Sequence, residues 1–426
     1  MAGDIQEQLA VLRRRIAKID SRFAQKEVAA AAPAHSAGLQ PAKRLIEEWC
    51  SGSEIQTPFG AHFETEQLYE SHRRHGSFDL SALNELPEDL LDAMSEGSIA
   101  RSHCSRWAFL DTETTGLAGG SGTYAFLIGV GRITTEGFRL RQFFMRDLGE
   151  EASVLHALAN HLTEFDTLVT YNGKAYDQPL LETRFRMVRA RHPFGRMEHL
   201  DLLFGARRLW KLRFDSCRLV ELENQILGME REGDLPGAMI PYVYFEYLRT
   251  KEAFRVAPIL HHNANDILTL ACLTAIVPWA FRSPETAPLA HGAEMVGLAR
   301  WLRRGERHES ALALFRRAIQ KGLPDELMFR TVWDMALLEK KLGREPAAVT
   351  LFTELAECRN NHRLAAFEEL AKYYEHRERN YSMALEFTLS AIAVQDSDGL
   401  RGRRMRLERR LAAKRPRPRR LLLGEP

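Results

Sequence analysis

The chain has 426 residues, enough for two or three ordinary domains, each with its own hydrophobic core. Hydrophobic residues make up 45% and charged residues 27%, which excludes collagenous, fibrous and intrinsically disordered proteins. The five cysteines are dispersed and form no CxxC pair, so we expect reduced thiols in a cytoplasmic protein. The best apolar stretch, Ile267–Phe281, is too short to cross a bilayer, and the first residues do not resemble a secretory signal. We therefore expect no association with a membrane.

Residues 1–42 predict an amphipathic helix followed by a linker. Apolar residues recur in steps of four and three from Ile5 to Phe23, the spacing of a short coiled coil that would dock on a partner chain or on this one. Residues 43–100 predict a small pre-domain. Within it, a Thr-Pro-Phe-Gly turn between strand-like runs predicts a hairpin over Glu54–Tyr69.

Residues 101–282 predict an α/β domain with a mixed sheet flanked by helices. Trp107–Leu110 is a short apolar strand, and two further strands, Tyr124–Ile133 and Phe138–Met145, are joined by a link so short that they must be antiparallel. A strand at Thr167–Tyr171 then lies between two predicted helices, a pattern typical of a parallel, right-handed crossover. We therefore expect a sheet that begins as a meander and continues as βαβ.

Residues 295–396 predict an all-α region of helical repeats. The segments beginning at Ala311, Ala348 and Ala384 resemble one another and are offset by 37 and 36 residues. This period is close to that of tetratricopeptide-like helix pairs, which would provide a concave surface for a peptide or protein partner. A plain helical bundle packed on the α/β domain is the alternative.

Residues 397–426 predict a basic tail. Eleven Lys or Arg residues and one acid lie between Arg401 and Arg420, which leaves 48 basic and 55 acidic residues in the first 400. A basic tail on a mildly acidic body is typical of a protein whose partner carries phosphates. A solvated tail with no partner is the alternative.

Four carboxylates of the α/β domain form the most informative pattern. Asp111 and Glu113 are two apart where an apolar strand ends, so both project from one face. Asp177 opens a helix after a second strand, and Asp266 is predicted at the start of an apolar helix. If these groups converge they repel one another, and all-oxygen ligation favours Mg²⁺ or Mn²⁺ as the compensating ions. Two such ions are the usual means of hydrolysing a phosphodiester, with a nearby histidine as the proton acceptor.

Each of these residues also has a structural interpretation. An Asp-x-Glu at a strand end is commonly exposed to solvent, and Asp177 or Asp266 could simply cap a helix. A single histidine is more often a satisfied core or surface residue than a base. The order of the pieces along the chain is what favours a site.

This ordered set resembles the DEDD exonucleases of the ribonuclease-H-like superfamily, and more closely its YprB-like branch. The resemblance spans about Lys43 to Pro278. It is carried by Asp111-Thr-Glu-Thr-Thr-Gly116 with the glycine-rich run to Tyr124, by Tyr171-Asn-Gly-Lys-Ala-Tyr-Asp177, by Asp234-Leu-Pro-Gly237, and by His262-Asn263-x-x-Asp266. The helical repeats that follow are similar to the layout of that family.

The resemblance implies a 3′→5′ exonuclease that acts on a nucleic acid, at a single-stranded end, with two Mg²⁺ or Mn²⁺ ions. Asp111, Glu113, Asp177 and Asp266 would be the metal ligands. His261 has the four-residue gap to Asp266 that histidine-type exonucleases use, whereas His262 has the three-residue gap of the tyrosine type. The His-Asn-x-x-Asp pattern of the YprB-like proteins favours His262, which on a helix also shares a face with Asp266.

Further residues are candidates for contact with the substrate: Thr114, Gly116, Asn172 and Lys174. Asn172 and Lys174 could instead merely shape the turn in which they lie. The run Ala118–Gly122 is a flexible loop that could let a nucleic-acid backbone come close, or a permissive strand connection. The segment Arg207–Arg213 interleaves Trp210 with basic residues, as single-strand binding surfaces do, although the solvent face of a helix has the same composition.

Overall fold

The computed structural model describes residues 46–95, 97–116, 122–231 and 233–414. The N-terminal helix and linker predicted for residues 1–42, most of the Ala118–Gly122 loop and the end of the basic tail lie outside the described residues.

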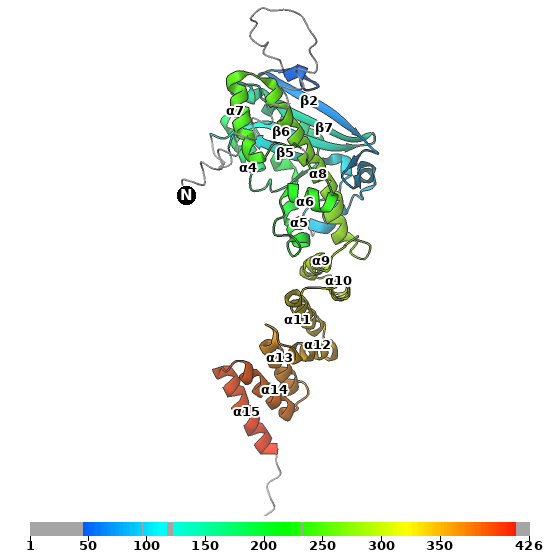
Figure 1. The fold of residues 1–426 in the computed structure, drawn as a ribbon, viewed down its shortest axis with the longest axis vertical. Helices are drawn as coiled ribbons and strands as arrows, with labels where there is room; N and C mark the ends of the chain where they lie inside the picture. The colour runs from blue at the N-terminus through cyan, green and yellow to red at the C-terminus, as the bar shows by residue number, and fades with distance from the viewer. Residues whose placement is uncertain (1–45, 96, 117–121, 232, 415–426) are drawn as a thin grey trace, which may run out of the picture. The chain divides into compact units, whose positions relative to one another are not determined.

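A seven-stranded mixed sheet is the centre of the fold, with the strand order β1-β2-β7-β6-β5-β8-β9 (Figure 1). The first five strands in this order are antiparallel neighbours, whereas β8 runs parallel to β5 and β9 runs parallel to β8. This arrangement confirms the predicted meander followed by a parallel crossover. The strands are β1 (Gly52–Thr57), β2 (Gly60–Glu70), β5 (Trp107–Thr114), β6 (Ala125–Thr134), β7 (Gly137–Phe144), β8 (Thr167–Thr170) and β9 (Glu198–Asp201), with a separate two-stranded ribbon of β3 (Arg74–His75) and β4 (Phe78–Asp79).

The hairpin predicted over Glu54–Tyr69 forms as β1 and β2, and it belongs to the main sheet. β2 pairs with β7 from Phe63 to Glu70, where the apolar side chains Phe63 and Tyr69 are buried. The sheet therefore continues across residue 100, where the sequence predicts a domain boundary, because β2 has an apolar surface that only a neighbouring strand and helix can cover.

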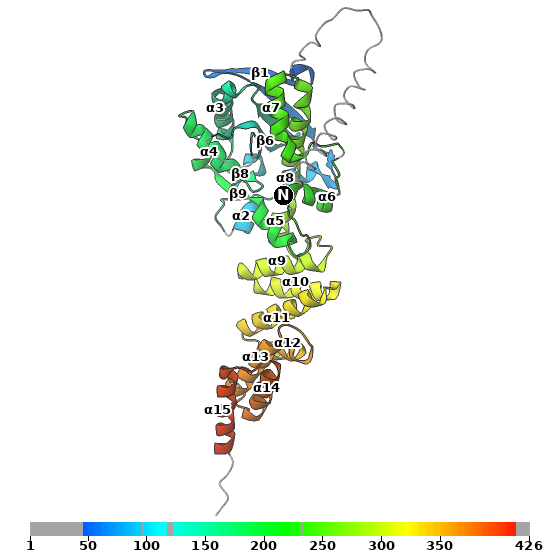
Figure 2. The same cartoon turned by 60° about the vertical axis from the view of Figure 1, so that its left-hand side comes forward.

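Helices cover both faces of this sheet. On one face lies α3 (Glu151–His161), and the buried pair of Arg184 Nε and Glu151 Oε1, 2.5 Å apart, joins it to α4 (Asp177–Met187) (Figure 2). On the other face α8 (Ala257–Arg282) contacts β5 and β6. Shorter helices surround these: α2 (Leu90–Ser95), α5 (Leu202–Trp210), α6 (Leu219–Leu227) and α7 (Ile240–Thr250).

The central helix α8 begins earlier than the sequence suggests. Asp266 lies well inside it, because Pro258 occupies its first turn, where the missing N–H is not needed, and the polar run after Leu260 continues the helix. The prediction that Asp266 starts a helix is therefore wrong. By length and hydropathy alone, Ala253–Arg282 could cross a membrane, but 83% of its most apolar window is buried inside the protein. Such burial is what the core helix of a folded domain requires.

The described residues after 291 are helical up to Lys414, and consecutive helices pack as pairs (Figure 2). Ala311, Ala348 and Ala384, the equivalent positions of the three similar segments, are all buried at helix–helix contacts. The predicted all-α region is therefore confirmed. The helices are α9 (Gly292–Arg304), α10 (His308–Lys321), α11 (Asp325–Lys341), α12 (Glu345–Glu357), α13 (Arg363–His376), α14 (Tyr381–Val394) and α15 (Asp398–Lys414).

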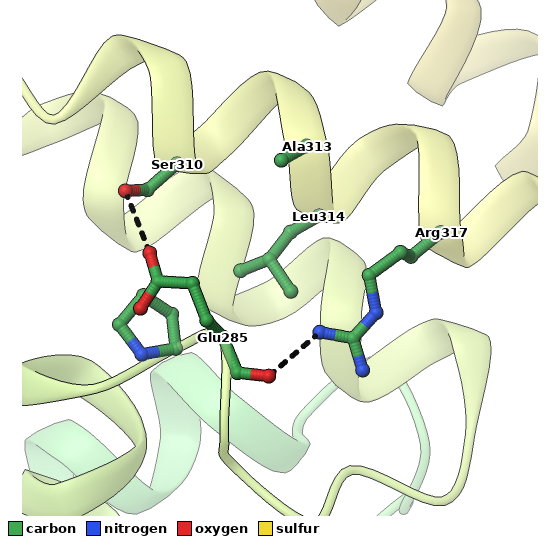
Figure 3. A pocket seen from close by; sticks show the side chains of 6 residues that line it. Glu285, Ser310, Ala313, Leu314 and Arg317 are labelled. Atoms are coloured by element: carbon green, nitrogen blue, oxygen red, sulfur yellow. Dashed lines mark hydrogen bonds between the residues drawn. The ribbon is translucent and has the colours of Figure 1, made fainter.

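The link after α8 is held against α10 by side chains at a hollow of about 340 Å³ (Figure 3). The Ser310 hydroxyl donates to Glu285 Oε1 over 3.2 Å, and Arg317 donates to the Glu285 backbone oxygen over 3.4 Å. These bonds fix the start of the helical region at its junction with α8.

Much of the predicted basic tail is a folded helix, which corrects the expectation of a tail from residue 397. In α15, Leu407 is buried and Arg406 makes two hydrogen bonds, of 2.8 and 2.9 Å, to Glu375 of α13. Arg403 and Arg410 approach the same carboxylate. The arginines thus form ion pairs with the rest of the protein, because the side chain of Glu375 is fully buried and its charge needs compensation.

Candidate metal centre

Asp111 and Glu113 lie within β5, not beyond its end. Pairing of β5 with β8 stops at Phe109, but pairing with β6 continues through Glu113, and Asp111 lies opposite Gly129. Alternation along the strand points both carboxylates to the face covered by α8, so the prediction that they share a face is confirmed. Of the two neighbouring strands, only β6 pairs with this part of β5.

Glycines of β6 bring α8 close to this face. A Cβ atom on Gly129 would lie 2.2 Å from Asn263 Oδ1 and 2.3 Å from Ile267 Cδ1, and one on Gly131 would lie 2.7 Å from Ile267 Cγ2. Any larger residue would therefore push the helix away from the sheet. The Gly-Val-Gly run of β6 is what allows α8 to place Asn263 and Asp266 beside Asp111.

Asn263 connects the helix to the first carboxylate. Its amide nitrogen donates to Asp111 Oδ2 over 2.9 Å and to the Asp111 backbone oxygen over 3.2 Å. Its amide oxygen accepts a 2.8 Å hydrogen bond from Gln142 of β7. Gln142 therefore orients Asn263, and Asn263 orients Asp111. The sequence pattern His-Asn-x-x-Asp contains Asn263 but predicts no role for it.

Asp177 belongs to the segment that follows β8, the strand on the opposite side of β5 from β6. It is the first residue of α4, and the Thr112 hydroxyl donates to its Oδ1 over 2.5 Å. Burial raises the pKa of Asp177 to about 6, although the hydrogen bond from Thr112 opposes the shift. The carboxylate is thus fixed by the strand that carries Asp111.

The pKa values of Asp111 and Glu113 are raised by burial and by the other carboxylates of the set. Burial raises the pKa of Asp111 well above its usual range, and the charges of Asp266 and Asp177 raise it further. Burial likewise raises the pKa of Glu113, with contributions from Asp111, Asp266 and Asp177. Acidic groups that destabilise each other's charged form in this way are typical of a site that receives a cation.

His262 faces these carboxylates, whereas His261 does not. Ligand atoms of Glu113, His262 and Asp266 all lie within 4.8 Å of one another. His262 Nδ1 lies 2.7 Å from Asp234 Oδ2, and its Nε2 lies 3.5 Å from Asp266 Oδ2. Burial lowers the pKa of His262, but the hydrogen bond to Asp234 and the charges of Asp266 and Asp234 outweigh it, so the pKa is raised. His261 is exposed and contacts Asn265.

Arg231 lies at the candidate site although no sequence motif marks it. Its side chain is only 5% exposed, and its guanidinium lies 2.5 Å from Asp266 Oδ1 and 3.2 Å from Asp234 Oδ2. It also forms two hydrogen bonds with Glu223, a buried carboxylate on α6. Arg231 lies three residues before the quoted Asp-Leu-Pro-Gly run, and no spacing or motif marked it. A permanent cation is therefore already present beside Asp266.

The residues predicted to contact the substrate mostly take part in the hydrogen bonds of turns. The Thr114 hydroxyl donates to the Gly116 oxygen over 2.9 Å. Asp201 accepts hydrogen bonds from the backbone N–H groups of Asn172, at 2.8 Å, and Lys174, at 3.1 Å, and Asn172 has a positive φ of 68°. The Lys174 side chain is exposed. Contact of these four residues with a nucleic acid stays a prediction.

Comparison with known proteins agrees with this geometry. Residues 108–277, which include all four carboxylates and Arg231, match the RNase_H superfamily. The chain is 31% identical over 384 residues to Uncharacterized protein YprB of Bacillus subtilis (strain 168), and the match covers 86% of this chain and 87% of that protein. The chain therefore belongs to the YprB family, with a domain of the RNase_H superfamily followed by an all-helical region.

Proposed function

We propose that this protein is a metal-dependent nuclease, a 3′→5′ exonuclease that hydrolyses phosphodiester bonds of DNA or RNA. The observation that carries the proposal is the gathering of Asp111, Glu113, Asp177 and Asp266 into one partly buried cluster, in which burial and the charges of the other carboxylates raise the pKa values of Asp111 and Glu113. Membership of the RNase_H superfamily supports the same chemistry.

The donor set of this cluster fits hard divalent cations. Its ligand atoms are carboxylate oxygens and the imidazole nitrogen of His262, and no cysteine is among them. Mg²⁺ and Mn²⁺ accept such donors. Asp111, Glu113, Asp177 and Asp266 would hold two such ions, which when bound would supply an activated water and stabilise the leaving oxygen. The pKa shifts described above favour this interpretation over a cluster that stays without a cation.

The side chains of this protein have separate tasks in the proposal. His262 accepts a proton at Nε2, the ring nitrogen nearer Asp266, because Asp234 accepts the Nδ1 hydrogen and stabilises the ring once it is charged. Asn263 and Thr112 hold Asp111 and Asp177 in place. His261, which points to solvent, has no part in the proposed reaction.

End-labelled single strands incubated with Mn²⁺ or Mg²⁺ test the proposal. The wild-type protein should shorten them from the 3′ end, and Asp111→Asn and Glu113→Gln should reduce cleavage to background. Asp215→Asn, which changes an exposed carboxylate outside the cluster, is the matched control and should cleave as the wild type does. His262→Gln should lose activity and His261→Gln should keep it. Cleavage that survives both Asp111→Asn and Glu113→Gln refutes the assignment.

A second function is favoured by Arg231, whose charge compensates Asp266 without any metal. In that case the protein is a catalytically quiet nucleic-acid-binding or scaffold protein that uses its basic C-terminal segment and its helices. Binding of a strand that is never cut, with either metal, would decide for this alternative.

For the helical region we propose tetratricopeptide-like repeats that bind a segment of a protein partner. The burial of Ala311, Ala348 and Ala384 at equivalent helix positions supports a repeat. The free state of all five cysteines supports a cytoplasmic location. Chemical cross-linking of the intact protein in cell extract should place a partner on α9–α14, and cross-links confined to other regions would contradict this.

A further inference from the structure

A hollow of about 320 Å³ lies at the end of β9. Its volume is near the lower limit for ligand pockets, about 300 Å³, which suits one nucleotide. Lys174, His199, Phe204 and Arg208 are among the residues that line it.

The rim of this hollow combines an exposed aromatic ring with two cations. Phe204 is 54% exposed, although most of α5 around it is buried. Phe204 and Arg208 are four residues apart on α5 and so share a face. The Arg208 guanidinium lies over the ring of Trp301, 5.2 Å from its centre, which restrains the cation while the residue stays exposed. Within the described residues, neither Lys174 nor Arg208 forms an ion pair with an acid.

Asp201 also lines the hollow, and its charge is largely compensated. Its two oxygens accept backbone N–H groups from Asn172, Lys174 and Leu203. Asp201 is 4% exposed. The charge that a ligand meets is therefore dominated by Lys174 and Arg208.

The hollow is joined to the candidate metal centre. Thr170 of β8 pairs with Asp201 of β9 in a parallel ladder, so the ends of these strands lie at the same edge of the sheet as Asp111. His199 lies 2.5 Å from Gln178, the residue after Asp177, and 2.8 Å from the Thr170 hydroxyl. Lys174 precedes Asp177 by three residues in the same turn. A chain that leaves the carboxylates across the end of β8 would therefore reach the hollow.

We propose that Phe204, Lys174 and Arg208 form a nucleic-acid subsite that holds a nucleotide of the single strand next to the one at the carboxylates. Phe204 stacks on a base, a contact open to every base, and the two cations bind the flanking phosphates. The inference rests on the proposed nuclease function and names where its substrate is held. It also changes the role of the Arg207–Arg213 segment: Trp210 is buried and Arg213 pairs with Glu294, so Phe204 supplies the aromatic surface instead.

Fluorescence anisotropy in EDTA separates binding from cleavage. The probes are 5′-fluorescein single strands of about 12 nucleotides, one DNA and one RNA of the same sequence. Phe204→Ala should weaken binding at least about fivefold, the loss expected for one stacked base. The double variant Lys174→Ala/Arg208→Ala should reduce the slope of log affinity against log salt by about 1.4, since each phosphate contact contributes about 0.7 for a single strand.

Matched controls lie elsewhere on the described surface. Phe59→Ala removes a ring that is 59% exposed at the opposite edge of the sheet, and Arg74→Ala removes an exposed cation on β3; both should bind as the wild type does. Circular dichroism verifies the fold of each variant. If the wild type binds and cuts both strands but Phe204→Ala and the double variant bind equally well, the subsite is refuted and the nuclease is not. If the wild type binds neither strand, or binds only an acidic peptide probe, the subsite and the proposed function both fall.

Discussion

Replacing Arg231 by methionine should destabilise the protein and leave charges without partners. Arg231 is 5% exposed and Glu223 is 1% exposed, so neither group gains compensation from water when its partner is removed. Removing one member of a buried pair costs about 3–5 kcal/mol. Arg231 also contacts Asp266 and Asp234, which argues for the upper half of that range.

Urea unfolding followed by the fluorescence of the buried Trp107 and Trp210 measures the effect. The denaturation midpoint should fall steeply for Arg231→Met and stay unchanged for Arg218→Met, which removes an exposed arginine of the same region. The double variant Glu223→Gln/Arg231→Met should recover much of the loss, because the neutral amide needs no cation and can still accept the hydrogen bond of Thr269.

The same variant reports on metal binding. Without Arg231, Asp266 has no resident cation, so Mn²⁺ should raise the melting temperature of Arg231→Met more than that of the wild type. A loss of less than about 1 kcal/mol in Arg231→Met would show that the guanidinium does not compensate Glu223 and Asp266. An equal response of both proteins to Mn²⁺ would place the ions away from Asp266.

Three further predictions concern packing, pH and the C-terminal helix. Gly129→Ala should cost about 1–3 kcal/mol and reduce nuclease activity by displacing α8, whereas Gly195→Ala, with open space at its Cβ, should do neither; urea unfolding and the cleavage assay measure both. Burial lowers the pKa of His161 from 6.5 to about 4, so between these pH values the unfolded state binds more protons than the folded state. The free energy of unfolding should therefore fall as the pH drops from 6.5 toward 4, by about 3 kcal/mol from this residue. His161→Phe should remove that share of the pH dependence, and an unchanged slope would contradict the assignment. Glu375→Gln should leave Arg406 without its buried partner and make α15 more sensitive to trypsin, and unchanged digestion would show that the pair does not hold the helix.

The sequence patterns predicted the sheet well because they depend on local properties. Short links require antiparallel neighbours, and alternating strands and helices require a parallel crossover, so β5 to β8 followed from chain order alone. The start of α8 is misplaced because the polar residues from His261 to Asp266 resemble a helix cap, although His262, Asn263 and Asp266 face the candidate site. Helix α15 is not predicted because its arginine-rich sequence resembles a solvated tail. Only the structure shows that Arg406 pairs with the buried Glu375 of α13.

The candidate site was predictable only in part. Asp111, Glu113, Asp177 and His262 occur in patterns that can be recognised along the chain, and the geometry brings them together with Asp266. Arg231 and Gln142 could not be predicted, since the contacts of Arg231 with Asp266 and of Gln142 with Asn263 join residues far apart in sequence. The same is true of Gly129, whose significance appears only when α8 lies over it.

The early end of β8 has a consequence for how this fold can vary. Beyond Phe109, β5 has no strand partner on the β8 side, and β8 is followed by the turn from Tyr171 to Tyr176, which leads to Asp177 at the start of α4. A turn of another length or composition could be exchanged there without a shift in the register of any strand pair. The turn that leads to Asp177 can therefore vary independently of the strand pairing that positions Asp111 and Glu113.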